Sequence, residues 1–258
     1  MAHLTVQFFS ETLGKCETIE VILPQKTIGQ IGMDGAGTDN GCYPVLYLLH
    51  GLSDDQSIWM RRTSIERYAS RYNLAVVMPN ADVSFYTDMS SGLPYWTYIS
   101  EELPLICRQF FPRISSRRED TFAAGLSMGG YGAFKLALRH PERFAAAASL
   151  SGVLDISYAL DGGRDAFFTR IFGDLNTLKG SDNDLLALSR RMPADVPSPR
   201  LFACIGTEDF LYENNQKAVH AFREAGLDLT YFEDAGAHTW EFWDKWTQKA
   251  LEFMLNGR

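Results

Sequence analysis

The order of apolar and polar residues predicts strands that alternate with helices along most of the chain. Several strands are continuous apolar runs, such as YPVLYLLHG at 43–51, which is typical of strands buried on both faces of a sheet. Strands joined by helices form a mostly parallel sheet with helices on both faces. The other predicted strands are 74–80, 121–124, 144–152, 200–206 and 227–234, and the predicted helices are 62–72, 101–111, 129–140, 214–226 and 240–255.

Four segments depart from this alternation. Residues 4–10 and 17–24 are rich in β-branched and aromatic residues and predict an antiparallel pair of strands. Residues 29–41 are glycine-rich and polar, so we expect a surface connection; they lack the G-K-[ST] pattern of a phosphate loop. Residues 153–199 are irregular and polar and predict a cap-like excursion above the sheet. We therefore expect a single α/β domain over residues 1–258.

The composition narrows the class of protein. The 258 residues, 46% of them hydrophobic, suffice for one large domain with a substantial core. The net charge of −8 comes from interspersed acidic and basic residues, which argues against a nucleic-acid partner. No apolar run approaches the roughly 18 residues of a membrane span, and the first residues show no signal-peptide pattern. Whether a leader has been removed is left open.

The cysteines indicate the compartment. Cys16, Cys42, Cys107 and Cys204 lie far apart in the sequence and include no C-x-x-C pair. This spacing favours free, buried thiols in a reducing environment. We therefore expect a cytoplasmic protein.

A candidate nucleophile lies in FAAGLSMGGYGAF at 122–134, where Gly125, Ser127 and Gly129 form the pattern G-x-S-x-G. The pattern fits a sharp turn from strand to helix that exposes the serine hydroxyl. With glycine and serine each near 7% of residues, a chain of this length matches by chance roughly once in ten. The significance of the pentapeptide therefore depends on partners elsewhere in the chain.

Such partners follow other predicted strands. Asp209 comes after 200–206 and His238 after 227–234, so the chain order is Ser, Asp, His. This is the order found in α/β-hydrolases. Because the carboxyl ends of parallel strands meet at one edge of a sheet, we expect the three side chains to lie together.

Each of these residues suits one role in acyl transfer. His238 can take the proton of the Ser127 hydroxyl, and Asp209 can hold the other ring nitrogen of the histidine. The oxyanion formed on attack needs hydrogen-bond donors in place. The backbone N–H groups of Met128, at the start of the following helix, and of Leu52, after the first buried strand, are the candidates.

Other residues compete for these roles. Glu208 and Asp155 also follow predicted strands and are rivals of Asp209 for the acidic position. We interpret His50 as a buried histidine that shapes the loop carrying Leu52.

Aromatic residues are numerous beside these loops, and we expect Trp96 and Trp240 to wall a substrate pocket. The excursion has few apolar residues, gathered at 167–172, which are enough to close a small pocket. They do not form the broad apolar face of a lipase lid.

Six segments together resemble the esterase D family, and within it most closely the short-chain carboxylesterases called tributyrin esterases. The resemblance implies an α/β-hydrolase fold with Ser127 as nucleophile, Asp209 and His238 as its partners, and Leu52 and Met128 as oxyanion-hole amides. The segments are YLLHGLSDDQSIWMRRTSIERYA, NADVSFYTDMSSG, YISEELP, AAGLSMGGYGA, IGTEDFLYENN and GAHTWEFWDKW.

S-formylglutathione hydrolases share this fold and the EELP and G-x-S-M-G-G segments. They typically carry G-L-T-C where this chain has Gly51, Leu52, Ser53 and Asp54. This difference disfavours a glutathione thioester as substrate.

We therefore expect a serine carboxylesterase that hydrolyses short-chain acyl esters through an acyl-enzyme intermediate, without a metal ion or cofactor. The alternatives are a carbohydrate acetyl or feruloyl esterase, an S-formylglutathione hydrolase-like thioesterase, a peptidase, or a non-catalytic binding module with this fold. The expected partner is a small-molecule ester, with no nucleic acid and no membrane. A homo-oligomer, the physiological pathway, the natural ester and its alcohol part are left open.

Overall fold

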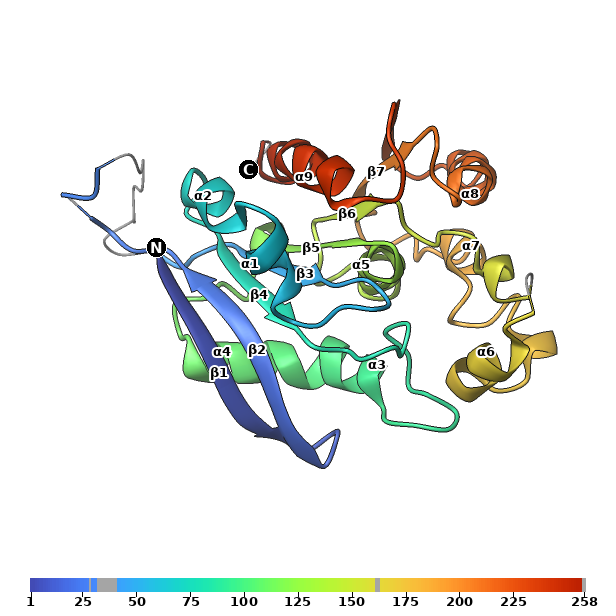
Figure 1. Ribbon diagram of the computed structural model, residues 1–258, viewed down its shortest axis with the longest axis horizontal. Helices are drawn as coiled ribbons and strands as arrows, with labels where there is room; N and C mark the ends of the chain where they lie inside the picture. Colours follow the sequence, from blue (N-terminus) through green and yellow to red (C-terminus); the bar gives the residue numbers. More distant parts are fainter. Residues whose placement is uncertain (28, 32–40, 161–162, 257–258) are drawn as a thin grey trace.

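One sheet of eight strands forms the centre of the computed structural model, which describes residues 1–27, 29–31, 41–160 and 163–256 (Figure 1). The order across the sheet is β1-β2-β4-β3-β5-β6-β7-β8. The strands are β1 (Ala2–Ser10), β2 (Lys15–Leu23), β3 (Val45–Leu49), β4 (Ala75–Pro79), β5 (Thr121–Leu126), β6 (Ala146–Leu150), β7 (Arg200–Gly206) and β8 (Leu229–Asp234).

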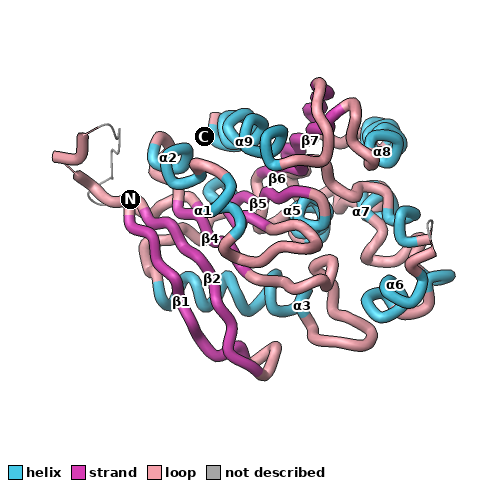
Figure 2. Tube along the Cα trace, in the orientation of Figure 1, coloured by secondary structure: helices cyan, strands magenta, loops and turns pink. Residues whose placement is uncertain are grey.

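Pairing in the sheet is antiparallel between β1, β2 and β4 and parallel between all the later neighbours. The predicted N-terminal hairpin is present at one edge of the sheet, where Figure 2 shows its two long strands. The mostly parallel sheet predicted from the sequence is therefore confirmed. Most of the glycine-rich connection at 29–41 lies outside the described residues.

Helices cover both faces of the sheet, because strands β2 to β7 alternate their apolar side chains between two separate clusters of buried residues. One face packs against α1 (Ile58–Arg62), α2 (Ile65–Ser70) and α9 (Trp240–Leu255). The other face packs against α4 (Leu103–Phe110), α5 (Met128–Arg139), α6 (Asp165–Phe172), α7 (Leu185–Ser189) and α8 (Tyr212–Glu224).

The structure differs from the predicted helices in two places. The helix expected at 62–72 is two short helices, because the backbone of Thr63 is extended and its hydroxyl donates to the Trp59 carbonyl (2.7 Å). The helix expected at 101–111 begins earlier, since α3 (Tyr95–Thr97) and a π-helical turn (Tyr98–Glu102) lead directly into α4.

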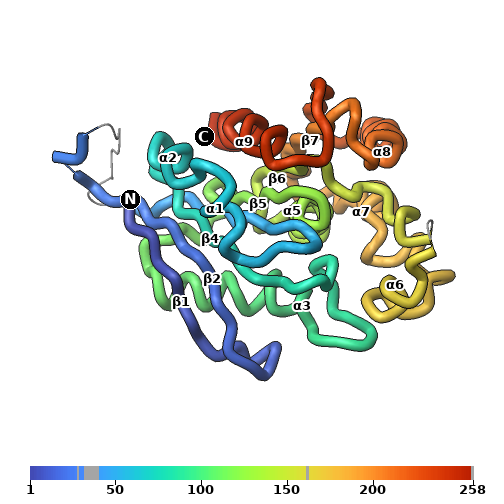
Figure 3. Tube along the Cα trace, in the orientation of Figure 1, coloured from blue at the N-terminus to red at the C-terminus, as the bar shows by residue number. Residues whose placement is uncertain are grey.

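The excursion at 153–199 holds α6, α7 and two short 3-10 turns, Ile156–Ala159 and Leu175–Thr177. Figure 3 shows α6 beside the loop that precedes α3, although the two are far apart in sequence. Backbone N–H groups of Ser90 and Ser91 donate to carbonyls of Ile171 and Arg170 in α6 (both 2.9 Å). The excursion is therefore bound to the body of the domain.

The four cysteines are free thiols, as expected, but only Cys107 and Cys204 are buried; Cys16 and Cys42 are exposed. The expectation that all four are buried was therefore wrong, because Cys16 and Cys42 lie outside the two apolar clusters. Among the described residues, no helix is both long and apolar enough to span a membrane.

Lys135 lies fully buried in α5, the helix that follows Ser127. Its amine donates to the Tyr86 carbonyl (2.9 Å), the Thr87 hydroxyl (2.9 Å) and the Asn183 side-chain oxygen (2.7 Å). Burial lowers the pKa of Lys135. The three acceptors around the amine match the three N–H groups of its protonated form. The amine also lies 4.6 Å from the ring centroid of Trp96. This side chain joins α5, the loop before α3 and the excursion.

We expect Lys135→Met to lower the free energy of unfolding by about 2–4 kcal/mol, because the volume is kept while three buried acceptors lose their donor. Urea denaturation measures this change. The exposed Lys179 provides a matched control, and Lys179→Met should change stability by less than about 0.5 kcal/mol. Equal stability of the two variants would contradict a structural role for the buried amine.

Candidate active site

Ser127 forms the turn between β5 and α5. Its φ of 52° and ψ of −117° are unfavourable for a residue with a side chain, at a cost of roughly 1–3 kcal/mol. Its N–H donates to the Leu150 carbonyl (2.9 Å), and its carbonyl accepts from the N–H groups of Tyr131 (3.2 Å) and Val153 (3.3 Å). These hydrogen bonds hold the strained turn, so the predicted strand–turn–helix geometry is present.

The two glycines of the pattern permit this turn by close backbone contact. A Cβ atom at Gly125 would lie 2.4 Å from the Gly129 carbonyl carbon, and one at Gly129 would lie 2.3 Å from the Leu49 carbonyl oxygen. Neither position can take a larger residue without separating β5, α5 and the end of β3.

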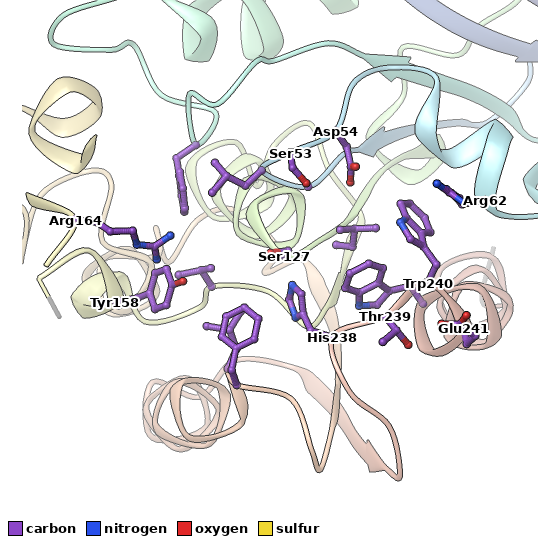
Figure 4. Close-up of a pocket in the computed structure, with 18 residues that line it drawn as sticks. Ser53, Asp54, Arg62, Ser127, Tyr158, Arg164, His238, Thr239, Trp240 and Glu241 are labelled. Carbon is purple, nitrogen blue, oxygen red and sulfur yellow. The ribbon is translucent and has the colours of Figure 1, made fainter. Parts of the chain in front are cut away.

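His238 lies beside Ser127 and points toward it (Figure 4). Its Nδ1 is 2.8 Å from Oδ2 of Asp209, whose side chain is fully buried. Oδ1 of Asp209 accepts from the Leu211 N–H (2.9 Å). Because an ionised carboxylate only accepts hydrogen bonds, Nδ1 is the donor and Nε2 of the neutral ring is an acceptor.

The rival acids occupy other positions. Glu208 is exposed and accepts hydrogen bonds from the Gly236 N–H and the Thr207 hydroxyl, which lower the pKa of its carboxyl. Glu208 thus braces the loop before His238 without contacting the ring. Asp155 accepts from the Ser157 N–H (2.9 Å) at the start of a 3-10 turn in the excursion.

His50 holds the loop that follows β3. Its Nδ1 donates to the Gly51 carbonyl (2.7 Å), and its Nε2 accepts from the Ala81 N–H (2.9 Å). Burial lowers the pKa of His50, in keeping with a neutral ring that has one donor and one acceptor. The Tyr86 hydroxyl donates to the His50 carbonyl (3.0 Å). The reading of His50 as a buried histidine that shapes this loop agrees with these contacts.

The two candidate oxyanion-hole amides border the Ser127 turn. Met128 is the first residue of α5, so its N–H has no intrahelical acceptor. Within the described part of the chain, neither this N–H nor that of Leu52 donates a hydrogen bond to a protein atom. In this respect both N–H groups meet the requirement for an oxyanion-hole donor, which must have no other acceptor.

A cavity of about 600 Å³ lies over Ser127 and His238. Its apolar lining includes Leu52, Phe85 and Phe210. The Phe210 ring lies 4.5 Å from that of His238, centroid to centroid, although the side chain is largely exposed. The Phe210 ring therefore partly shields one side of the imidazole from water.

Only one of the two tryptophans predicted to wall the pocket lines this cavity. Trp240 does, with its ring 5.2 Å from that of Trp59. Trp96 is not among the described residues that line it: it stacks on His140 (5.6 Å) and lies 4.5 Å from the Arg139 guanidinium. Its place beside α5 serves packing, so the expectation for Trp96 does not agree with the structure.

Several residues of the cavity were not predicted from the sequence. Phe210 directly follows Asp209, which could have marked it as a neighbour of the site. Tyr158 and Arg164 come from the irregular excursion, where no periodicity indicates the direction of a side chain. Arg62 lies at the end of α1.

Comparisons with known proteins place the chain in a family. A family model described as "Putative esterase" matches residues 10–251. The chain belongs to this esterase family. It is 34% identical to an acetyl esterase from Caldicellulosiruptor saccharolyticus over 264 aligned residues, which cover 98% of each protein.

Two solved structures from Staphylococcus aureus are similar to this esterase over nearly its whole length. The fluorophosphonate-binding serine hydrolase FphF is 35% identical with a TM-score of 0.88, covering 99% of this chain and 98% of that one. The S-formylglutathione hydrolase FrmB is 35% identical with a TM-score of 0.85, covering 99% of each. The predicted α/β-hydrolase fold is confirmed, and the protein is a carboxylic-ester hydrolase.

We expect Asp209→Asn to lower the kcat of this esterase for a 4-nitrophenyl ester by about 10⁴, because an amide favours the wrong tautomer of His238. Glu208→Gln is the matched control and should cost less than about tenfold, since Glu208 contacts the loop and not the ring. Steady-state kinetics of the two variants measure both effects. The reverse ranking would assign the acidic role to Glu208.

Proposed function

We propose that this esterase hydrolyses short-chain acyl esters, with Ser127 as nucleophile, His238 as general base and acid, and Asp209 as the residue that orients the imidazole. The hydrogen bond from His238 Nδ1 to the buried Asp209, beside the strained Ser127 turn, carries the proposal. Membership of the esterase family supports it.

In the proposed reaction, Nε2 of His238 takes the hydroxyl proton as Ser127 Oγ attacks the ester carbonyl. The backbone N–H groups of Leu52 and Met128 would stabilise the resulting oxyanion. The intermediate collapses to an acyl-enzyme, and the protonated His238 gives its proton to the departing alcohol. Water, deprotonated by the same imidazole, then releases the acid and restores Ser127.

The geometry of the excursion supports a short acyl chain. The aromatic rings of Phe168 and Phe172 in α6 lie 5.5 and 5.8 Å from that of Phe85. These rings are packed inward and do not form an exposed apolar lid. Contrary to the expectation from the sequence, residues 167–172 are not among the described residues that line the cavity. Tyr158 and Arg164 instead border the cavity on this side. The similarity to an acetyl esterase agrees with small acyl groups, and we propose a role like that of tributyrin esterases.

A second candidate is thioester hydrolysis, which the similarity to the S-formylglutathione hydrolase FrmB favours. Asp54, in the position where those enzymes typically carry a cysteine, lines the cavity, and burial raises the pKa of its carboxyl. A carbohydrate acetyl or feruloyl ester is compatible with the same site. We also propose a cytoplasmic location from the free thiols, two of which are exposed.

Ser127→Ala should abolish turnover of 4-nitrophenyl acetate, a loss of several orders of magnitude, because triad members act as a unit. It should also abolish labelling by a fluorophosphonate probe. Circular dichroism should show an unchanged fold. The control is Ser91→Ala at an exposed serine outside the cavity, which should keep full activity. Hydrolysis or labelling that survives in Ser127→Ala would remove Ser127 from the nucleophilic role.

The acyl-length profile should favour acetate to butyrate and decline steeply by about eight carbons. Each methylene that fits the cavity adds up to about 0.8 kcal/mol of binding, whereas longer chains clash or remain in water. Values of kcat/KM for a series of 4-nitrophenyl esters measure this profile. A steady rise through twelve carbons, or a jump in rate above the solubility limit, would instead indicate a lipase.

A further inference from the structure

The two sides of the cavity differ in charge. Figure 4 shows Arg164 and Tyr158 on one side of Ser127 and Arg62, Trp240 and Glu241 on the other. On the second side Arg62 is accompanied by the carboxyl groups of Asp54 and Glu241, which also line the cavity. Burial raises the pKa of the Asp54 carboxyl, and the positive charge of Arg62 opposes part of that rise. On this side of the cavity, acidic residues therefore accompany the positive charge of Arg62.

No described acidic residue that lines the cavity lies on the side of Arg164, since Figure 4 shows Asp54 and Glu241 on the other side of Ser127. Within the described ranges, no carboxylate lies within 4.0 Å of the Arg164 guanidinium, and the side chain makes no hydrogen bond to another residue. The side chain of Arg164 is itself exposed, so its guanidinium keeps contact with solvent. The charge of Arg164 is therefore available to a molecule in the cavity.

Aromatic rings hold the Arg164 guanidinium in place. Its carbon lies 4.9 Å from the ring centroid of Tyr158 and 5.1 Å from that of Phe168. Phe168 is fully buried, and Tyr158 lines the cavity. A guanidinium that lies over a ring keeps its N–H donors free at its edge, in a fork that matches a carboxylate. The excursion thus presents a positioned anion-binding group beside the nucleophile.

We propose that Arg164 binds a carboxylate carried by the ester substrate, so that the preferred substrates are esters with a negative charge a few bonds from the reacting carbonyl. This inference rests on the proposed function, because the bond that breaks is still the ester bond attacked by Ser127. The carboxylate is bound and not consumed. It can belong to the acyl part or to the alcohol part, and the experiment separates the two.

The test compares charged and neutral substrates of similar size. In the first pair, mono-4-nitrophenyl succinate carries the charge on the acyl part, and 4-nitrophenyl butyrate is its neutral counterpart. In the second pair, 4-acetoxybenzoate carries the charge on the alcohol part, and phenyl acetate is its neutral counterpart. For one of the pairs, Arg164→Gln should lower the charged-to-neutral ratio of kcat/KM about tenfold, mainly through KM. Arg164→Lys should restore part of the ratio, and added salt should lower the wild-type ratio.

Arg170→Gln is the matched control, since Arg170 is an exposed arginine of α6, the helix that directly follows Arg164, and does not line the cavity. It should leave both ratios and the neutral-ester rate unchanged. If Arg164→Gln still hydrolyses the neutral esters and its charged-to-neutral ratios equal those of the wild type for both pairs, the inference is overturned. Absence of hydrolysis for every ester in the wild type would instead overturn the proposed function.

Discussion

The close contact between α5 and the end of β3 is the constraint on which the site depends. Gly129 lets the helix approach the carbonyls of Leu49 and His50, where a single Cβ atom would collide. The same end of β3 leads into the loop of Leu52, so this contact sets how far that N–H lies from the Ser127 turn. The positive φ of Ser127 follows from the approach, because no relaxed backbone reverses so sharply between a strand and a helix.

The parallel sheet explains why so much of the site could be predicted from the sequence. Strands buried on both faces are continuous apolar runs, and their carboxyl ends lie at one edge whatever their order. Ser127 and Asp209 each follow such a run and His238 follows the parallel edge strand β8, so no knowledge of side-chain packing is needed to bring them together. The choice between Asp209 and Glu208 is different. The two are adjacent in sequence, and only the structure shows that Asp209 is buried against the ring while Glu208 faces solvent.

What the sequence could not predict depends on contacts between elements that are distant in the chain. Trp96 looks like a pocket residue by its neighbours in sequence, but it packs against Arg139 and His140 at the end of α5. The break at Thr63 depends on one side-chain hydrogen bond within a run of helical spacing. The direction of Arg164 depends on the aromatic rings beneath it, in a segment without periodicity. Local pattern carries no information on any of these contacts.

The helix that carries Ser127 also positions the opposite wall of the cavity. Through Lys135 it is hydrogen-bonded to the loop 85–87, whose phenylalanine lines the cavity, and to Asn183 of the excursion. Apolar packing alone tolerates small sliding movements, whereas three short hydrogen bonds from one amine restrict both distance and direction. The position of Phe85 relative to the Ser127 turn is thus tied to contacts made by one helix.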